Sequence, residues 1–73
     1  MRPFPPTRRQ LDLLRFVRGF QLAHGFGPSV QEIAAGLGFR NASKSAAVRL
    51  VVGCEERGLL RRLPSRARSI ELV

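Results

Sequence analysis

The spacing of hydrophobic positions predicts a first helix that begins just after residue 7. Leucine, valine and phenylalanine recur every three or four residues, the period of one face of an amphipathic helix. These apolar positions are Leu11, Leu13, Leu14, Phe16, Val17 and Phe20. Before them, Thr7 and Gln10 have the spacing of a capping box, in which each side chain bonds to the backbone N–H of the other residue. The helix should run to Ala23 or His24, because the glycines and proline of residues 25–28 end it.

Two further helices follow by the same reasoning. Ser29 and Glu32 form a second capping box, which opens a short helix. Its inward positions are Val30, Ile33, Ala34 and Leu37. Gly38 stands where a left-handed C-terminal cap is expected, and residues 39–42 are predicted to form a turn that Phe39 staples. Ser43 is the preferred cap of a third helix, which ends at residues 57–58. The buried face of that helix is predicted to hold Ala47, Val51 and Cys54, with Leu50 beside them.

The pattern changes near the C-terminus. Residues 59–63 form a short extended run, 64–67 a loop, and 69–72 an alternation of apolar and polar residues, which together predict a β-hairpin. The expected fold class is therefore α+β and mostly α: a three-helix winged helix-turn-helix with a C-terminal two-stranded β-hairpin as the wing. We expect a flexible proline-rich N-terminus over residues 1–6 and one folded domain over residues 7–73.

Composition narrows the possible functions. The chain has 73 residues and a formal net charge of +8, with twelve of its thirteen basic residues being arginine. Such a charge on a small surface indicates a polyanionic partner, most often nucleic acid. One cysteine excludes an intramolecular disulfide and, with one histidine, leaves no ligand set for a structural zinc ion. No paired carboxylates, Ser–His–acid set or phosphate-binding glycine loop is present, so neither an enzyme nor a cofactor is expected.

The chain carries no sign of a membrane or an export address. No apolar run approaches the roughly 18 residues of a membrane span. Residues 1–6 contain no continuous apolar stretch like that of a signal peptide. We therefore expect a cytoplasmic protein without a membrane partner.

A short capped helix, a glycine-containing turn and a further helix are typical of a helix-turn-helix. The exposed side of its second helix enters the major groove of DNA. Helical spacing places on that side Ser45, Val48, Arg49 and Val52, with Lys44 and Ala46 in the first turn. Arg49 suits bidentate hydrogen bonds to a guanine, and Ser45 suits a base or a phosphate. Val48 or Ala46 suits the methyl group of a thymine.

The predicted hairpin adds a second basic feature. Its arginines, with the one that precedes it, are Arg57, Arg61, Arg62, Arg66 and Arg68. Arg66 and Arg68, at the expected tip, suit phosphate or minor-groove contacts because the guanidinium is always charged and donates as a fork.

Several motifs in this order resemble the N-terminal DNA-binding domain of the LexA repressor family, over about residues 7–73. The segments that carry the resemblance are residues 7–11, 28–34, 38–40 and 43–72, with residues 43–45, 55–58 and 61–68 the most similar. The resemblance implies a winged helix-turn-helix that binds operator DNA and represses transcription, as in the bacterial SOS response. It places the recognition-helix contacts on Ser43, Lys44, Ser45, Ala46, Val48 and Arg49. The full set of candidate DNA-binding residues is Arg40, Ser43, Lys44, Ser45, Ala46, Val48, Arg49, Arg66 and Arg68.

The chain departs from the family pattern in two places. Asn41 and Ala42 resemble a two-residue insertion before Ser43, which either lengthens the turn or lets Asn41 cap an earlier helix start; we favour the longer turn. LexA proteins also carry a C-terminal domain for dimerisation and self-cleavage, and this chain ends where that domain begins. It is either an excised domain or a free-standing small protein, and the distinct proline-rich start favours the second.

Two rival functions stay open. Exposed Val48 and Val52 suit a protein-interaction module that modulates another transcription factor or polymerase. A structural nucleic-acid binder without sequence preference fits the charge equally well, but it explains the capped helix-turn-helix poorly. For the favoured function, the expected partners are double-stranded DNA and either a second copy on DNA or another regulatory protein.

Overall fold

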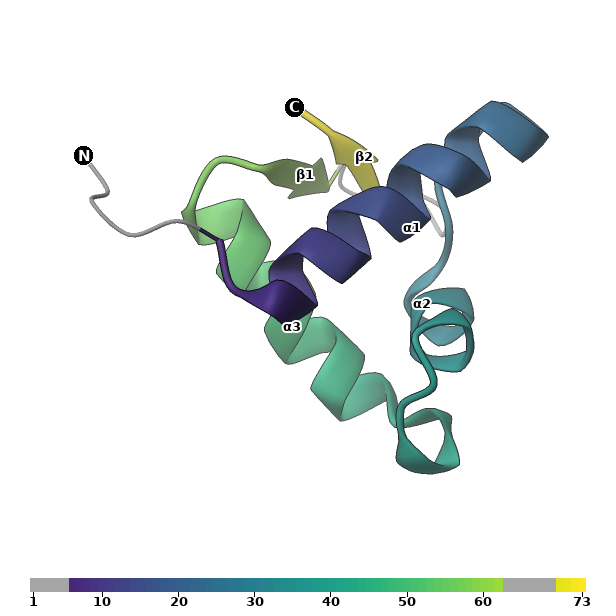
Figure 1. The fold of residues 1–73 in the computed structure, drawn as a ribbon, viewed down its shortest axis with the longest axis vertical. Helices are drawn as coiled ribbons and strands as arrows, with labels where there is room; N and C mark the ends of the chain where they lie inside the picture. The colour runs from purple at the N-terminus through teal and green to yellow at the C-terminus, as the bar shows by residue number, and fades with distance from the viewer. Residues whose placement is uncertain (1–5, 63–69) are drawn as a thin grey trace.

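The computed structural model describes residues 6–62 and 70–73, and these ranges contain helices and a two-stranded sheet (Figure 1). In chain order the elements are α1 (Arg8–His24), α2 (Val30–Gly36), the 3₁₀ turn η1 (Arg40–Ala42), α3 (Lys44–Glu56), β1 (Leu60–Arg62) and β2 (Ile70–Leu72). The two strands pair antiparallel. The predicted fold class, mostly α with a C-terminal pair of antiparallel strands, is confirmed. The proposed division at residue 6 stays a prediction, because residues 1–5 lie outside the described ranges.

All three helices begin at the residues that the sequence marks as caps. The Thr7 hydroxyl accepts from the Gln10 N–H at 3.1 Å, and the Gln10 side chain accepts from the Thr7 N–H at 2.9 Å. The Ser29 and Glu32 pair repeats this arrangement at 3.1 and 2.8 Å. At α3 the Ser43 hydroxyl accepts from the Ala46 N–H at 3.3 Å. Each cap satisfies a backbone donor that a helix start leaves without an internal partner.

The turn between α2 and α3 contains Asn41 and Ala42 and ends at the Ser43 cap of α3. Gly38 has a φ of +74°, the left-handed conformation predicted for it. Asn41 is also left-handed, with a φ of +56°, which asparagine tolerates better than most side chains. Ser43 remains the cap, so Asn41 and Ala42 lengthen the turn and Asn41 does not start the helix.

The strands are shorter than predicted. The Leu59 N–H donates to the Cys54 carbonyl at 2.9 Å, so Leu59 closes the last turn of α3 and the strand begins at Leu60. The second strand was expected over residues 69–72 and is observed at Ile70–Leu72. The predicted strand residues Leu63 and Ser69 lie outside the described ranges.

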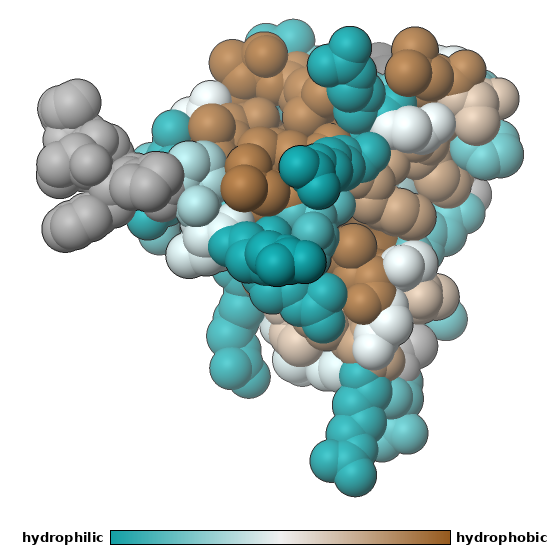
Figure 2. Space-filling view, viewed as in Figure 1, coloured by the Kyte–Doolittle hydropathy of each residue, from teal (hydrophilic) through white to brown (hydrophobic). Residues whose placement is uncertain are grey.

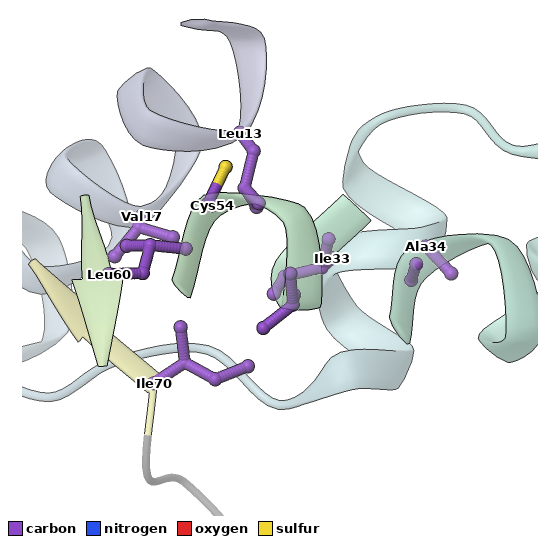
Figure 3. Packing of buried hydrophobic residues seen from close by; sticks show 9 residues of the cluster. Leu13, Val17, Ile33, Ala34, Cys54, Leu60 and Ile70 are labelled. Atoms are coloured by element: carbon purple, nitrogen blue, oxygen red, sulfur yellow. The ribbon is translucent and has the colours of Figure 1, made fainter. Parts of the chain in front are cut away.

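One core joins the helices to the sheet (Figure 3). Its buried members are Leu13 and Val17 of α1, Ile33 and Ala34 of α2, Ala47, Val51 and Cys54 of α3, and Leu60 and Ile70 of the strands. The loop after α1 is held tightly to this core, because a Cβ atom at Gly27 would overlap the carbonyl oxygen of Ile70. The predicted buried face of α3 is confirmed.

The predicted core face of α1 is wrong at one position. Leu11 is 40% exposed, whereas its neighbour Gln10 is only 8% exposed. Leu11 lies nearly opposite Leu13 around the helix and about a third of a turn from Val17, so it turns away from the core that they fill. Gln10 takes the inward position because the Thr7 N–H satisfies its side-chain oxygen there.

Candidate nucleic-acid interface

The outward face of α3 presents charged and polar side chains to solvent. Lys44, Ser45 and Arg49 are exposed, and Val48 is 36% exposed. The buried positions of the same helix, Ala47, Val51 and Cys54, hold the opposite side against the core. The spacing of core residues therefore fixes which side chains α3 offers to a partner, as predicted from the sequence.

Three residues expected at this face are less exposed than predicted. Ala46 and Val52 are half-buried, since each lies at the edge between the outward and the core-facing side of α3. Ser43 is half-buried as well, and its hydroxyl already accepts from the Ala46 N–H. The available surface is consequently narrower than the sequence suggested, and it centres on Ser45 and Arg49.

The turn η1 extends the basic surface beyond the start of α3. Arg40 and Asn41 are both exposed, and they immediately precede the N-terminal end of the helix, whose dipole favours anions. Asn41 was not among the candidate binding residues. Its polar side chain, next to Arg40 and just before the cap of α3, is the sequence signal that would add it to the candidates.

Arg9 of α1 contacts the segment that connects α2 to η1. Its Nη1 donates to the Leu37 carbonyl at 3.2 Å, and its Cζ lies 4.5 Å from the centre of the Phe39 ring. Phe39 in turn packs against the core, as predicted. A contact between residues 28 positions apart cannot be derived from local sequence patterns. It links α1 to the connection that leads into α3.

The strand arginines are engaged within the domain. Arg61 pairs with Glu71 across the sheet at 2.7 Å, and Arg62 pairs with Glu55 of α3 at 3.1 Å. Both pairs are exposed enough for solvent to weaken them. They still reduce the charge that these two arginines offer to a partner. The two residues expected to bind DNA from the hairpin tip, Arg66 and Arg68, lie outside the described ranges.

A family model, the LexA DNA binding domain, matches residues 3–69 of the chain. The protein belongs to the LexA DNA-binding domain family. The match covers α1 to α3, the first strand and the segment between the strands. It shows a DNA-binding domain of a type used in transcription regulation. This LexA-type domain contains no helix, within its described residues, that is long and apolar enough to cross a membrane.

Two titratable side chains of this LexA-type domain, Cys54 and His24, lie among apolar or aromatic neighbours. Cys54 is fully buried in the core, and burial raises the pKa of its thiol, an effect that the nearby charge of Arg57 partly offsets. His24 lies within a group of aromatic rings, 4.3 Å from the Phe20 ring. Residues 6–62 and 70–73 contain no cluster of three or more His, Cys, Asp or Glu side chains that could hold a metal ion.

Proposed function

We propose that this LexA-type domain is a sequence-specific repressor that reads double-stranded DNA through α3. The observation that carries the proposal is the outward face of α3, where Ser45 and Arg49 are exposed beside Lys44. Arg49 would donate two hydrogen bonds to a guanine edge in the major groove. Ser45 would bind a base or a phosphate, and Lys44 a phosphate near the helix start.

The small residues of α3 support close approach to DNA. Val48 and Ala46 carry no long side chain that would hold the helix away from the base edges, and either can contact the methyl group of a thymine. Arg40 and Asn41 would contact the backbone beside the groove, and Ser43 would fix the helix start. We include Arg66 and Arg68 as backbone or minor-groove contacts from the segment between the strands.

One such domain makes few phosphate contacts, so tight binding calls for two copies on a repeated or palindromic site. A homodimer on DNA, or a complex with another regulatory protein, is therefore part of the proposal. No catalytic step is assigned to the chain. A repressor of this kind would act in the bacterial cytoplasm, where the chromosome lies.

The structure supports the alternative function, a protein-interaction module, less well than the sequence did. It needed an apolar patch formed by Val48 and Val52, but Val52 is half-buried and Val48 is only 36% exposed. These two valines therefore do not form an exposed apolar patch large enough to mark a docking site.

The proposal is tested by comparing the affinity for a selected operator duplex with that for a scrambled duplex at one salt concentration. Arg49→Ala should reduce the difference by about 1–3 kcal/mol, since a guanine contact would be lost. Arg15→Ala is the matched control, because it removes the same charge from the exposed side of α1. Equal affinity of the unmodified chain for both duplexes would exclude sequence-specific reading.

A further inference from the structure

The side of α1 that faces away from the core carries a continuous exposed stripe. Its members, which we call the α1 stripe, are Arg8, Leu11, Arg15, Arg18 and Leu22. They follow one another at alternating spacings of three and four residues, which keeps them on one line along the helix. The buried residues Leu13 and Val17 lie on the other side. Figure 2 shows hydrophilic and hydrophobic side chains interleaved on one face of the domain.

Fold stability does not account for the composition of the α1 stripe. Leu22 is 80% exposed and Leu11 40% exposed, so neither contributes much to the core. Within residues 6–62 and 70–73, the ion pairs involve Arg61 and Arg62, and none involves an arginine of the stripe. Asp12, half-buried at the edge of the stripe, forms no ion pair with these arginines.

A glycine beside the α1 stripe is a second, independent observation. Gly19 is exposed, and no atom lies within 4 Å of the position that a Cβ atom would occupy there. Glycine destabilises a helix interior relative to alanine, and no close packing requires it at this site. Its neighbours three and four positions away on the helix surface are Arg15, Phe16, Leu22 and Ala23, of which Arg15 and Leu22 belong to the stripe. A residue without a side chain leaves a shallow place among them where another backbone can approach closely.

We propose that the α1 stripe is a docking surface for an acidic amphipathic helix of a partner protein. Glutamate or aspartate side chains would pair with the three arginines, and leucine-like side chains would cover Leu11 and Leu22. The partner helix would cross the stripe beside Gly19, next to Arg15 and Leu22, where the two backbones can come closest. This interaction is separate from DNA binding and does not depend on it.

DNA is a less suitable occupant of the α1 stripe. Phosphates pair with arginine but have no use for exposed leucines, and Leu22 is the most exposed large apolar side chain among the described residues. The stripe and the outward face of α3 also point away from the same core in different directions. We therefore expect a duplex lying along α3 to leave the α1 stripe uncovered.

The first test is an NMR titration of the isotope-labelled chain with a synthetic helical peptide whose leucines and glutamates share one face. A shuffled peptide of the same composition is the control. The ordered peptide should shift the amide signals of α1 from residue 8 to residue 22 and bind at least five times more tightly than the shuffled one. Equal binding of the two peptides, or shifts centred on α3, would overturn the proposal.

Surface variants then assign the contacts. Leu22→Ser and Arg18→Gln should each weaken peptide binding at least fivefold, and neither removes a core contact. Arg49→Gln removes the same charge from α3 and should leave the peptide Kd unchanged. If Arg18→Gln weakens operator binding as much as Arg49→Gln does, the stripe is a DNA surface and the proposal fails.

Gly19→Gln separates docking from folding. Glutamine is a good helix former, and no atom lies within 4 Å of the Cβ position at residue 19, so the variant should raise the Tm by a few degrees. It should nevertheless weaken peptide binding at least fivefold, because it fills the place where the partner backbone approaches. Unchanged peptide affinity in this stabilised variant would show that Gly19 is no part of a docking surface.

Discussion

Gln10 links two parts of the domain through the two ends of one side-chain amide. Its oxygen accepts from the Thr7 N–H and completes the cap of α1. Its nitrogen lies where a Cβ atom at Gly53 would come within 3.2 Å. Gly53 therefore weakens α3 locally but leaves room for the neighbouring helix. The sequence indicates the cost of that glycine, whereas its reason becomes visible only when α1 and α3 are placed side by side.

The buried thiol of Cys54 should make the free energy of unfolding depend on pH. The pKa of its buried thiol is raised, so the folded state keeps the proton above the ordinary thiol pKa of about 8.5, where the unfolded state loses it. The unfolded chain then binds fewer protons, and the free energy of unfolding must fall as the pH rises, by at most about 1.4 kcal/mol per pH unit. Urea denaturation at several pH values between about 8 and about 11 measures this fall in the free energy of unfolding.

The control for that measurement is Cys54→Ala, which removes the titrating group. The chain has no tyrosine and a single lysine, so few other groups titrate in this interval. The variant should be less stable at neutral pH, because it leaves a small cavity, but its stability should change much less with alkaline pH. The same pH slope in both proteins would contradict the role given to Cys54.

Among the elements, α2 depends most on its cap. It has seven residues, too few to be stable as an isolated helix. Its stability comes from the reciprocal bonds of Ser29 and Glu32 and from the burial of Ile33 and Ala34. Because α2 supports the turn that leads to α3, weakening this cap should loosen the part of the domain that presents η1.

Ser29→Ala should therefore lower the free energy of unfolding by about 1 kcal/mol. Ser43→Ala is the comparison, since Ser43 makes one longer cap bond of 3.3 Å and its loss should be smaller. Both values come from urea denaturation of the purified chain at neutral pH. A smaller loss for Ser29→Ala than for Ser43→Ala would contradict this ranking of the two caps.

An element could be predicted from the sequence when the residues that stabilise it lie close together along the chain. Caps act within four residues, so Thr7, Ser29 and Ser43 could be identified from the sequence alone. Leu11 was assigned to the wrong side of α1 because a row of leucines satisfies several helical faces equally well. The bracing of the turn by Arg9, and the pairing of Arg62 with Glu55, join residues of different elements. Local periodicity contains no information about either contact.

At the scale of the whole molecule, the net charge is +8, but not every basic side chain is equally available to a partner. Arg61 and Arg62 are paired with carboxylates, whereas Lys44 and Arg49 on α3 are exposed. The α1 stripe holds a further group of arginines on a different side. Binding to DNA should consequently use only part of the total charge.

The salt dependence of operator binding measures how many of the positive charges contact phosphates. With about four phosphate contacts, the logarithm of affinity should fall with the logarithm of salt concentration at a slope of about −3.6. Affinity would then drop roughly 150-fold between about 50 and 200 mM salt. Fluorescence anisotropy with a labelled duplex gives this slope directly. A slope near zero would show that phosphate contacts contribute little.

Sequence-specific reading by α3 is the central claim, and selection from random duplex DNA with the purified chain tests it most directly. The account predicts one enriched motif containing a guanine, and a loss of the preference for that guanine when the selection is repeated with Arg49→Ala. Failure to enrich any motif, or an unchanged motif with Arg49→Ala, would contradict it.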